Sequence, residues 1–364
     1  MRVGLLGAGI ISSGHATALQ NIPQAKLVAV CDAVPGRAAD VARDYGIPEV
    51  YESAKAMLRD AKVDVVHVLT PPQYHTALAL ECMEAGRHVL IEKPMGLSAE
   101  SCAALESESR RRGLVCAVNH NATHFPVVER LAAAIGSCRF GRVNHISCTF
   151  CVAPEHVPVA DPGNYMFQSP ANMIFEFGPH PFSIIRLLMG GLVKVQCVAT
   201  GERTLPNGKR YWNAWQFSAV CERGTASLYI GVGTGMRDIS LRVFGEDAVG
   251  TADLVRDRLV ISGTSPLRIA GPLAEGRAAA AESLRSAAAG VFHQYGTAAG
   301  LSGSRNRDPF LRSLRAFYDA LSAGRSPRED VSAGKAVVEY CEEAAKEMVF
   351  VAAHQGGLAS VAVR

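Results

Sequence analysis

The stretch Val3-Gly4-Leu5-Leu6-Gly7-Ala8-Gly9-Ile10-Ile11-Ser12 places a glycine-rich turn between an apolar, strand-like run and the start of a helical pattern. Gly7 permits a tight turn there, and Gly9 lets a pyrophosphate approach the backbone. The first helical turn, at Ile10 and Ile11, offers N–H groups and a favourable dipole to phosphates. Ser12 replaces the usual third glycine and is small enough for close packing. We therefore expect a dinucleotide here, although glycine turns often form without any ligand.

Asp32 strengthens this prediction, because it ends the second apolar run at the position where a carboxylate can accept hydrogen bonds from an adenosine ribose. The alternative is a turn-forming aspartate ahead of Pro35-Gly36. Ala33 offers no anchor for a 2′-phosphate, and Asp32 would repel one, so NAD is favoured over NADP. Arg37 keeps NADP open, because its side chain could swing toward the ribose.

Two further strand ends carry polar residues that we expect at the same edge of a parallel sheet. Thr70 and Pro71 follow the run that ends at Leu69, and His75 opens the next helical pattern; all three are candidate cofactor contacts. Glu92 and Lys93 end the following strand, which makes Lys93 a candidate acid or base and both residues candidate cofactor contacts. The alternatives are a helix-capping role for His75 and a surface ion pair of Glu92 with Lys93.

The order of patterns predicts two domains. Residues 2–118 alternate strands with helices, as in an α/β Rossmann domain with a parallel sheet, whereas several longer strand-like runs follow residue 140 with little helix between them. They predict an α+β domain with a large, mostly antiparallel open sheet, closed by helices near 273–290, 309–323 and 331–350. We expect an NAD(P)-binding Rossmann domain at 1–120, a substrate-binding and oligomerisation domain at 121–354, and a fraying tail at 355–364.

Composition limits the classes of function. The chain has 364 residues, a net charge of +3 and 48% hydrophobic residues, with no basic stripe suited to nucleic acid. No run reaches the roughly 18 to 20 apolar residues of a membrane span, and no signal peptide is seen, so we expect a cytoplasmic protein. The ten cysteines are scattered through strand and helix patterns, which favours reduced thiols over disulfides, and we expect no metal site.

Several of these motifs together resemble the Gfo/Idh/MocA oxidoreductases over nearly the whole chain. They are Gly7-Ala8-Gly9-Ile10-Ile11, His15, Asp32, Thr70-Pro71-Pro72 with His75, Ala85-Gly86-Arg87-His88-Val89 and Glu92-Lys93-Pro94. The resemblance implies a catalytic Lys93 beside a nicotinamide and a Lys93–Pro94 bond that is often cis. It also implies a homodimer or homotetramer formed through the second sheet.

The family's second signature, an aspartate four residues before a histidine, is matched in part. His180 is present, Glu176 stands in for the aspartate, and Ser183 replaces a second aspartate. On one helix, Glu176 and His180 would share a face. We expect His180 to be the base for a hydroxyl proton, with Glu176 as its acidic partner and Lys93 as electrostatic partner.

Three other polar residues are candidate substrate contacts: Asn119, His124 and Tyr165. For Asn119 and His124, a loop whose polar groups are already satisfied is the alternative.

These expectations combine into a hydride transfer between NAD(P) and a CH–OH or keto group of a sugar, cyclitol or sugar derivative. One alternative oxidises a sugar transiently with bound NAD in order to cleave a glycosidic bond. Another is a family member that senses nucleotides or sugars without turnover.

Overall fold

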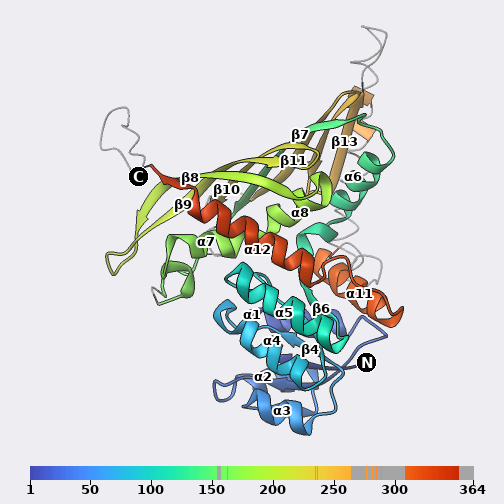
Figure 1. Ribbon diagram of the computed structural model, residues 1–364, viewed down its shortest axis with the longest axis vertical. Helices are drawn as coiled ribbons and strands as arrows, with labels where there is room; N and C mark the ends of the chain where they lie inside the picture. Colours follow the sequence, from blue (N-terminus) through green and yellow to red (C-terminus); the bar gives the residue numbers. More distant parts are fainter. Residues whose placement is uncertain are drawn as a thin grey trace. The chain divides into compact units, whose positions relative to one another are not determined.

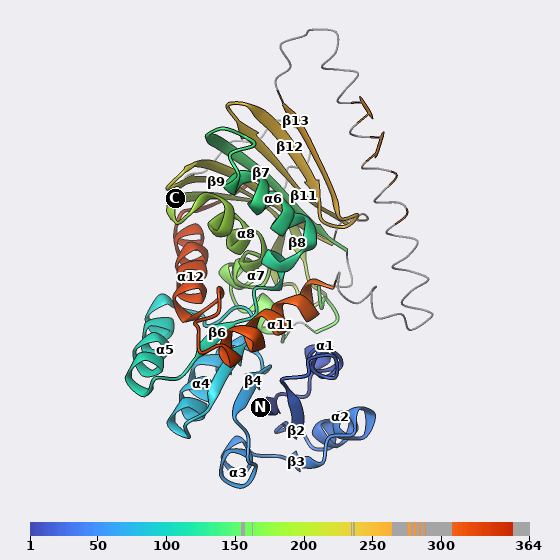
Figure 2. The same cartoon turned by 90° about the vertical axis from the view of Figure 1, so that its right-hand side faces the viewer.

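The computed structural model divides the chain into two compact units (Figures 1 and 2). It describes residues 1–153, 157–161, 163–233, 235, 237–263 and 308–351, with isolated positions between 264 and 307. The first unit is 1–121 with 309–339, and the second is 122–308 with 340–364. The predicted helix near 273–290 falls largely outside the described residues, and the tail at 355–364 falls wholly outside them.

The first unit contains a six-stranded parallel sheet in the order β3-β2-β1-β4-β5-β6. Its elements are β1 (Arg2–Leu6), α1 (Ile10–Leu19), β2 (Lys26–Cys31), α2 (Arg37–Tyr45), β3 (Glu49–Tyr51), α3 (Ala54–Asp60), β4 (Val65–Val68), η1 (Pro72–Tyr74), α4 (His75–Glu84), β5 (His88–Ile91), α5 (Ala99–Arg112) and β6 (Cys116–Val118). This strand order is that of a Rossmann domain, and it reverses between β1 and β4. The predicted α/β class is confirmed.

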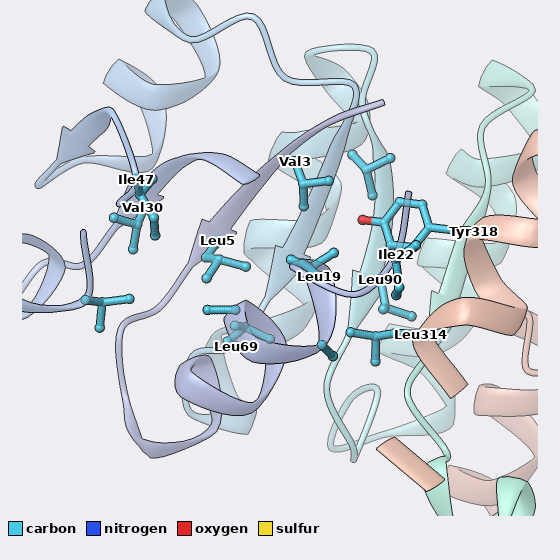
Figure 3. Close-up of a cluster of buried hydrophobic side chains, with 14 of the residues drawn as sticks. Val3, Leu5, Leu19, Ile22, Val30, Ile47, Leu69, Leu90, Leu314 and Tyr318 are labelled. Atoms are coloured by element: carbon cyan, nitrogen blue, oxygen red, sulfur yellow. The ribbon is translucent and has the colours of Figure 1, made fainter. Parts of the chain in front are cut away.

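Helix α11 (Pro309–Ser322), from near the end of the chain, also packs in the core of this unit (Figure 3). Leu314 and Tyr318 of α11 are fully buried in one cluster with Val3, Leu19 and Leu90. Our prediction that 121–354 forms one continuous second domain therefore needs correction, since 309–339 packs in the first unit. The physical reason is the apolar face of α11, which this sheet buries.

The second unit is built on an eight-stranded mixed sheet in the order β13-β12-β11-β7-β10-β9-β8-β14. Its strands are β7 (Val143–Val152), β8 (Leu192–Thr204), β9 (Arg210–Cys221), β10 (Gly224–Val232), β11 (Asp238–Gly245), β12 (Ala248–Asp253), β13 (Arg258–Gly263) and β14 (Met348–Phe350). The pairs β7–β10 and β8–β14 are parallel and the other five are antiparallel. The predicted, mostly antiparallel open sheet is confirmed.

Helices accompany this sheet in the second unit. They are η2 (Asn121–His124), whose first residue belongs to the first unit, α6 (Pro126–Gly136), η4 (Tyr165–Phe167), α7 (Pro170–Phe177) and α8 (Pro179–Met189). Helix α8 packs against β7 and β10. The boundary between the two units falls within α12 (Val331–Lys346).

Three strands were missed by the sequence analysis. Strand β3 has only three residues, and strand β12 is rich in small residues, so neither forms a clear apolar run. The helix expected at 331–350 ends at Lys346, and β14 follows because it pairs with β8. None of the helices in the described residues is long and apolar enough to cross a bilayer.

Helix α11 provides a direct test of this division. Leu314→Ala should lower the free energy of unfolding by about 2–5 kcal/mol, because it leaves a cavity in the first core. Urea unfolding measures this loss. The exposed control Ala316→Ser should change it by less than about 0.5 kcal/mol. Equal effects of the two substitutions would contradict the packing described for α11.

Candidate functional site

The glycine turn after β1 is shaped by a close approach of two backbones. Gly7 has φ +113°, and a Cβ there would lie 2.7 Å from the backbone carbon of Leu69. A Cβ on Gly9, by contrast, would meet no atom within 4 Å. Ile10 begins α1 and is 99% exposed, and no side chain caps this helix. The first backbone N–H groups of α1, at Ile10 and Ile11, have no partner within the helix and border open space.

The Ser12 side chain is fully buried, and its hydroxyl donates to the Gly9 carbonyl at 2.6 Å. The small side chain that we expected at this position therefore packs within the domain.

The Asp32 carboxylate lies at the end of β2 and closes this turn. It accepts hydrogen bonds from the backbone N–H of Ala8 at 2.7 Å and of Val34 at 2.8 Å. A carboxylate has about four acceptor positions, so two remain for a ligand. Arg37 is exposed at the start of α2.

The loops after β4 and β5 are tied together by His75. Its Nδ1 lies 2.8 Å from the carbonyl oxygen of Pro94, and its Nε2 lies 2.6 Å from that of Thr70. The ring is 1% exposed, so it joins the loops instead of presenting a nitrogen to a ligand. The Thr70 hydroxyl is buried without a hydrogen-bond partner in the described residues, and exposed Pro71 precedes η1.

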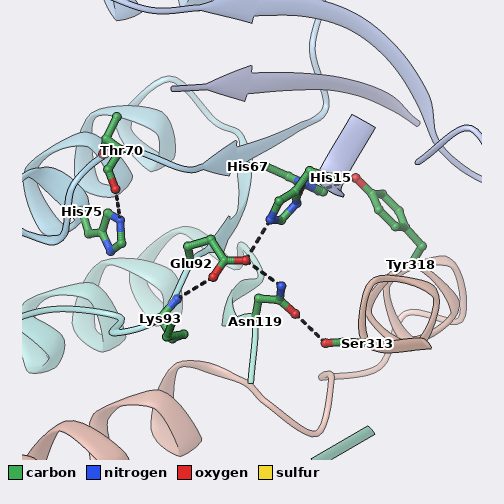
Figure 4. A network of polar contacts seen from close by, with 9 residues as sticks. All are labelled: His15, His67, Thr70, His75, Glu92, Lys93, Asn119, Ser313 and Tyr318. Atoms are coloured by element: carbon green, nitrogen blue, oxygen red, sulfur yellow. Dashed lines mark hydrogen bonds and ion pairs between the residues drawn. The ribbon is translucent and has the colours of Figure 1, made fainter. Parts of the chain in front are cut away.

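Glu92 and Lys93 lie where β5 ends (Figure 4). The Lys93–Pro94 bond is cis, as the resemblance implies. Glu92 is 7% exposed and accepts hydrogen bonds from His15 Nε2 at 2.9 Å, Asn119 Nδ2 at 2.6 Å and the Lys93 backbone N–H at 3.1 Å. Burial alone would raise the pKa of Glu92, but the contacts with His15, Asn119 and Lys93 together lower it. Glu92 therefore anchors the backbone ahead of Lys93.

The network around Glu92 extends to residues that the sequence analysis missed. His67 Nδ1 lies 2.8 Å from His15 Nδ1, and His67 Nε2 lies 2.8 Å from the Tyr318 hydroxyl. Asn119, expected as a substrate contact, is fully buried and accepts from the Ser313 hydroxyl at 2.7 Å. One residue in the sequence could have predicted this network: His67 is a polar residue inside an apolar strand.

In the second unit, the Tyr165 hydroxyl donates a hydrogen bond to the Glu176 carboxylate. Burial, followed by the neighbouring Glu176, raises the pKa of Tyr165 well above its usual value near 10, so the phenol keeps its proton. His180 stacks on Phe150 with ring centroids 5.3 Å apart. His124 is buried, with Nδ1 3.6 Å from the Glu129 carboxylate.

One prediction about this segment needs correction. Glu176 and His180 do not share one helix, because α7 ends at Phe177 and α8 begins at Pro179. Pro179 lacks the N–H that would continue the hydrogen bonding. The Ser183 hydroxyl donates to the His180 carbonyl at 2.9 Å, within α8.

The buried histidines make stability depend on pH. Burial lowers the pKa of both His67 and His75 below the usual 6.5. The unfolded chain therefore binds more protons below pH 6.5, and the free energy of unfolding falls there by up to about 1.4 kcal/mol per pH unit for each histidine. His75→Gln should reduce the change of the free energy of unfolding with pH by the contribution of one histidine. Urea unfolding between about pH 5 and pH 7 measures this change. Tyr45→Phe should leave it unchanged, and an unchanged slope in His75→Gln would show that His75 does not titrate as described.

Comparisons with known proteins show which families and structures this chain is similar to. Residues 1–120 match the family model described as the oxidoreductase family Gfo/Idh/MocA, NAD-binding Rossmann fold. The chain is 29% identical over 205 residues to trans-1,2-dihydrobenzene-1,2-diol dehydrogenase of Sus scrofa, covering 56% of this chain and 60% of that protein. It is 33% identical over 193 residues to inositol 2-dehydrogenase of Rhizobium meliloti (strain 1021), covering 52% and 55%. The matched region thus spans about 60% or less of these two relatives.

A solved structure extends the likeness of fold to most of the chain. Levoglucosan dehydrogenase in complex with NADH superposes with a TM-score of 0.79 at 20% identity, covering 96% of this chain and 98% of that one. The glycine turn, Asp32 and Glu92-Lys93-Pro94 lie within the matched residues 1–120. Residues 1–120 are therefore similar to the NAD-binding Rossmann domain of the Gfo/Idh/MocA oxidoreductase family.

Proposed function

We propose that the protein is an NAD-dependent dehydrogenase that transfers a hydride between the nicotinamide and a secondary hydroxyl or keto group of a sugar, cyclitol or sugar derivative. The observation that carries this proposal is the carboxyl edge of the Rossmann sheet. There the open turn at Gly9 follows β1, and Lys93 follows β5. The Asp32 carboxylate, which keeps free acceptor positions, follows β2. The relatives' names, which specify dihydrodiol, inositol and levoglucosan dehydrogenases, support the same class of reaction.

The residues at this edge fit a dinucleotide. The buried Thr70 hydroxyl lacks a partner in the described residues, and the space beside Gly9 is open. We assign Ile10 and Ile11 backbone N–H groups to the pyrophosphate, Asp32 to the ribose hydroxyls, and Thr70 and Pro71 to the loop that borders the cofactor. When bound, NAD supplies the hydride chemistry.

The charge at the ribose position favours NAD over NADP. Asp32 is an acceptor and would repel a 2′-phosphate, whereas it can bind two neutral hydroxyls. Arg37 is exposed at the start of α2 and is the cation that would permit NADP.

The proton chemistry is assigned to three residues. Lys93 supplies a positive charge beside the developing alkoxide. His180 takes or returns the hydroxyl proton, because an imidazole titrates near neutral pH. Glu176, which accepts a hydrogen bond from Tyr165, is the acidic partner of His180, and Tyr165 positions Glu176.

Nucleotide titration tests the cofactor assignment. We expect NADH fluorescence to change on binding, with weaker binding of NADPH. Asp32→Asn should weaken NADH binding by about tenfold, because it removes charge-assisted hydrogen bonds. The matched control is Asp40→Asn, which alters an exposed aspartate on α2 that pairs with Arg43 and should bind NADH normally. No fluorescence change with either nucleotide would refute the cofactor assignment.

The chemical step is tested by Lys93→Met. NADH formation is followed with NAD and, in turn, inositol, levoglucosan and trans-1,2-dihydrobenzene-1,2-diol. We expect at least one to be oxidised, and Lys93→Met to lower kcat by about a hundredfold or more while NADH affinity stays within a few fold. Lys26→Met, at the other end of the sheet, is the control. Unchanged turnover in Lys93→Met would remove this lysine from the mechanism.

A further inference from the structure

The direction of the hydrogen bonds around Glu92 follows from where the Tyr318 hydroxyl hydrogen points. Tyr318 is fully buried, and His67 Nε2 is the only acceptor that the described residues offer its hydroxyl hydrogen. If Tyr318 donates, His67 Nε2 is unprotonated, and the hydrogen of a neutral His67 ring lies on Nδ1. His67 Nδ1 then donates to His15 Nδ1 at 2.8 Å.

The same direction of donation continues from His15 to Glu92. His15 accepts at Nδ1, so its own hydrogen lies on Nε2, from which it donates to Glu92 at 2.9 Å. Both imidazoles are then neutral, and every described donor has an acceptor. Burial lowers the pKa of His67 well below its usual value, which agrees with a neutral ring.

The competing arrangement carries an extra proton. A charged His15 would donate from Nδ1 to His67, and His67 would donate from Nε2 to the Tyr318 oxygen. The hydroxyl hydrogen of Tyr318 would then be buried without an acceptor in the described residues, which is unfavourable. Tyr318 thereby disfavours a His15–Glu92 ion pair.

We propose that Tyr318, through His67 and His15, keeps this imidazole pair uncharged at neutral pH, so that the imidazoles do not offset the negative charge of Glu92 beside Lys93. Tyr318, His67 and His15 are thus positioning residues that set the electrostatic environment of Lys93. This inference rests on the proposed function for its meaning, since it concerns the lysine assigned there.

The groups that face the imidazole pair come from the end of β5 and from α11. They are Glu92 after β5, Tyr318 on α11, and the uncharged rings of Phe310 and Phe317 on the same helix. Asn119, after β6, reaches Glu92 from the other side (Figure 4). The two imidazoles themselves come from α1 and β4.

The first test needs neither cofactor nor substrate. Nitrogen-15 NMR of the histidine-labelled full chain at about pH 7 should show His15 protonated on Nε2 and His67 protonated on Nδ1. A charged His15, or His67 protonated on Nε2, would overturn the proposal.

The second test removes the hydroxyl that sets the direction. In Tyr318→Met, the thioether sulfur can accept a hydrogen bond from His67 Nε2 and carries no hydrogen that needs an acceptor. The proton affinity of His67 should therefore rise by about tenfold, which moves its titration up by about one pH unit. Over that pH range the new imidazolium should compensate the charge of Glu92 near Lys93, and the pH profile of kcat measures this effect.

The matched control is Ser313→Ala, which removes another buried hydroxyl of α11 but one that bonds Asn119 instead of an imidazole. It should leave both tautomers and the titration unchanged. An equal shift in both variants, or none in Tyr318→Met, would contradict the role of Tyr318. If the imidazole results hold while Lys93→Met keeps full turnover, the proposed function fails and the hydrogen-bond direction stands.

Discussion

A buried carboxylate that keeps its charge organises much of the first unit. Removing Glu92 from water costs several kcal/mol unless hydrogen bonds replace the lost hydration. Its partners come from α1, from the residue after β6 and from its own backbone, and Asn119 is held in turn by Ser313 of α11. A helix almost two hundred residues further along the chain thus helps to satisfy the charge beside Lys93.

The sequence predicted the features that depend on local chemistry. Gly7 must adopt a positive φ where Leu69 approaches, and no larger residue fits there, so the turn is visible in the residues themselves. Continuous apolar runs similarly revealed the central parallel strands. The place of α11 was not predictable in this way. Its amphipathic pattern shows that one face is buried but does not show which of two sheets buries it.

The same limit applies within the candidate site. His75 and Asn119 were expected near a ligand because they follow strand ends, but carbonyl oxygens and Glu92 occupy their polar atoms. His67 indicates a polar site inside an apolar strand, yet Tyr318, its partner, lies 251 residues away. The break between Glu176 and His180 was readable, since Pro179 cannot continue a hydrogen-bonded helix. The four-residue spacing of Glu176 and His180, taken without Pro179, instead predicted a single helix.

How a buried carboxylate is held decides what its charge can do. A cationic partner would cancel most of the field, whereas neutral donors stabilise the anion and leave its net charge in place. The structure offers Glu92 an amide, a backbone N–H and an imidazole whose proton arrangement depends on Tyr318. The Glu176 carboxylate likewise receives a hydrogen bond from a phenol that keeps its proton. A tyrosine can therefore influence the charge of a site without touching a ligand, because burial fixes where its hydrogen must point.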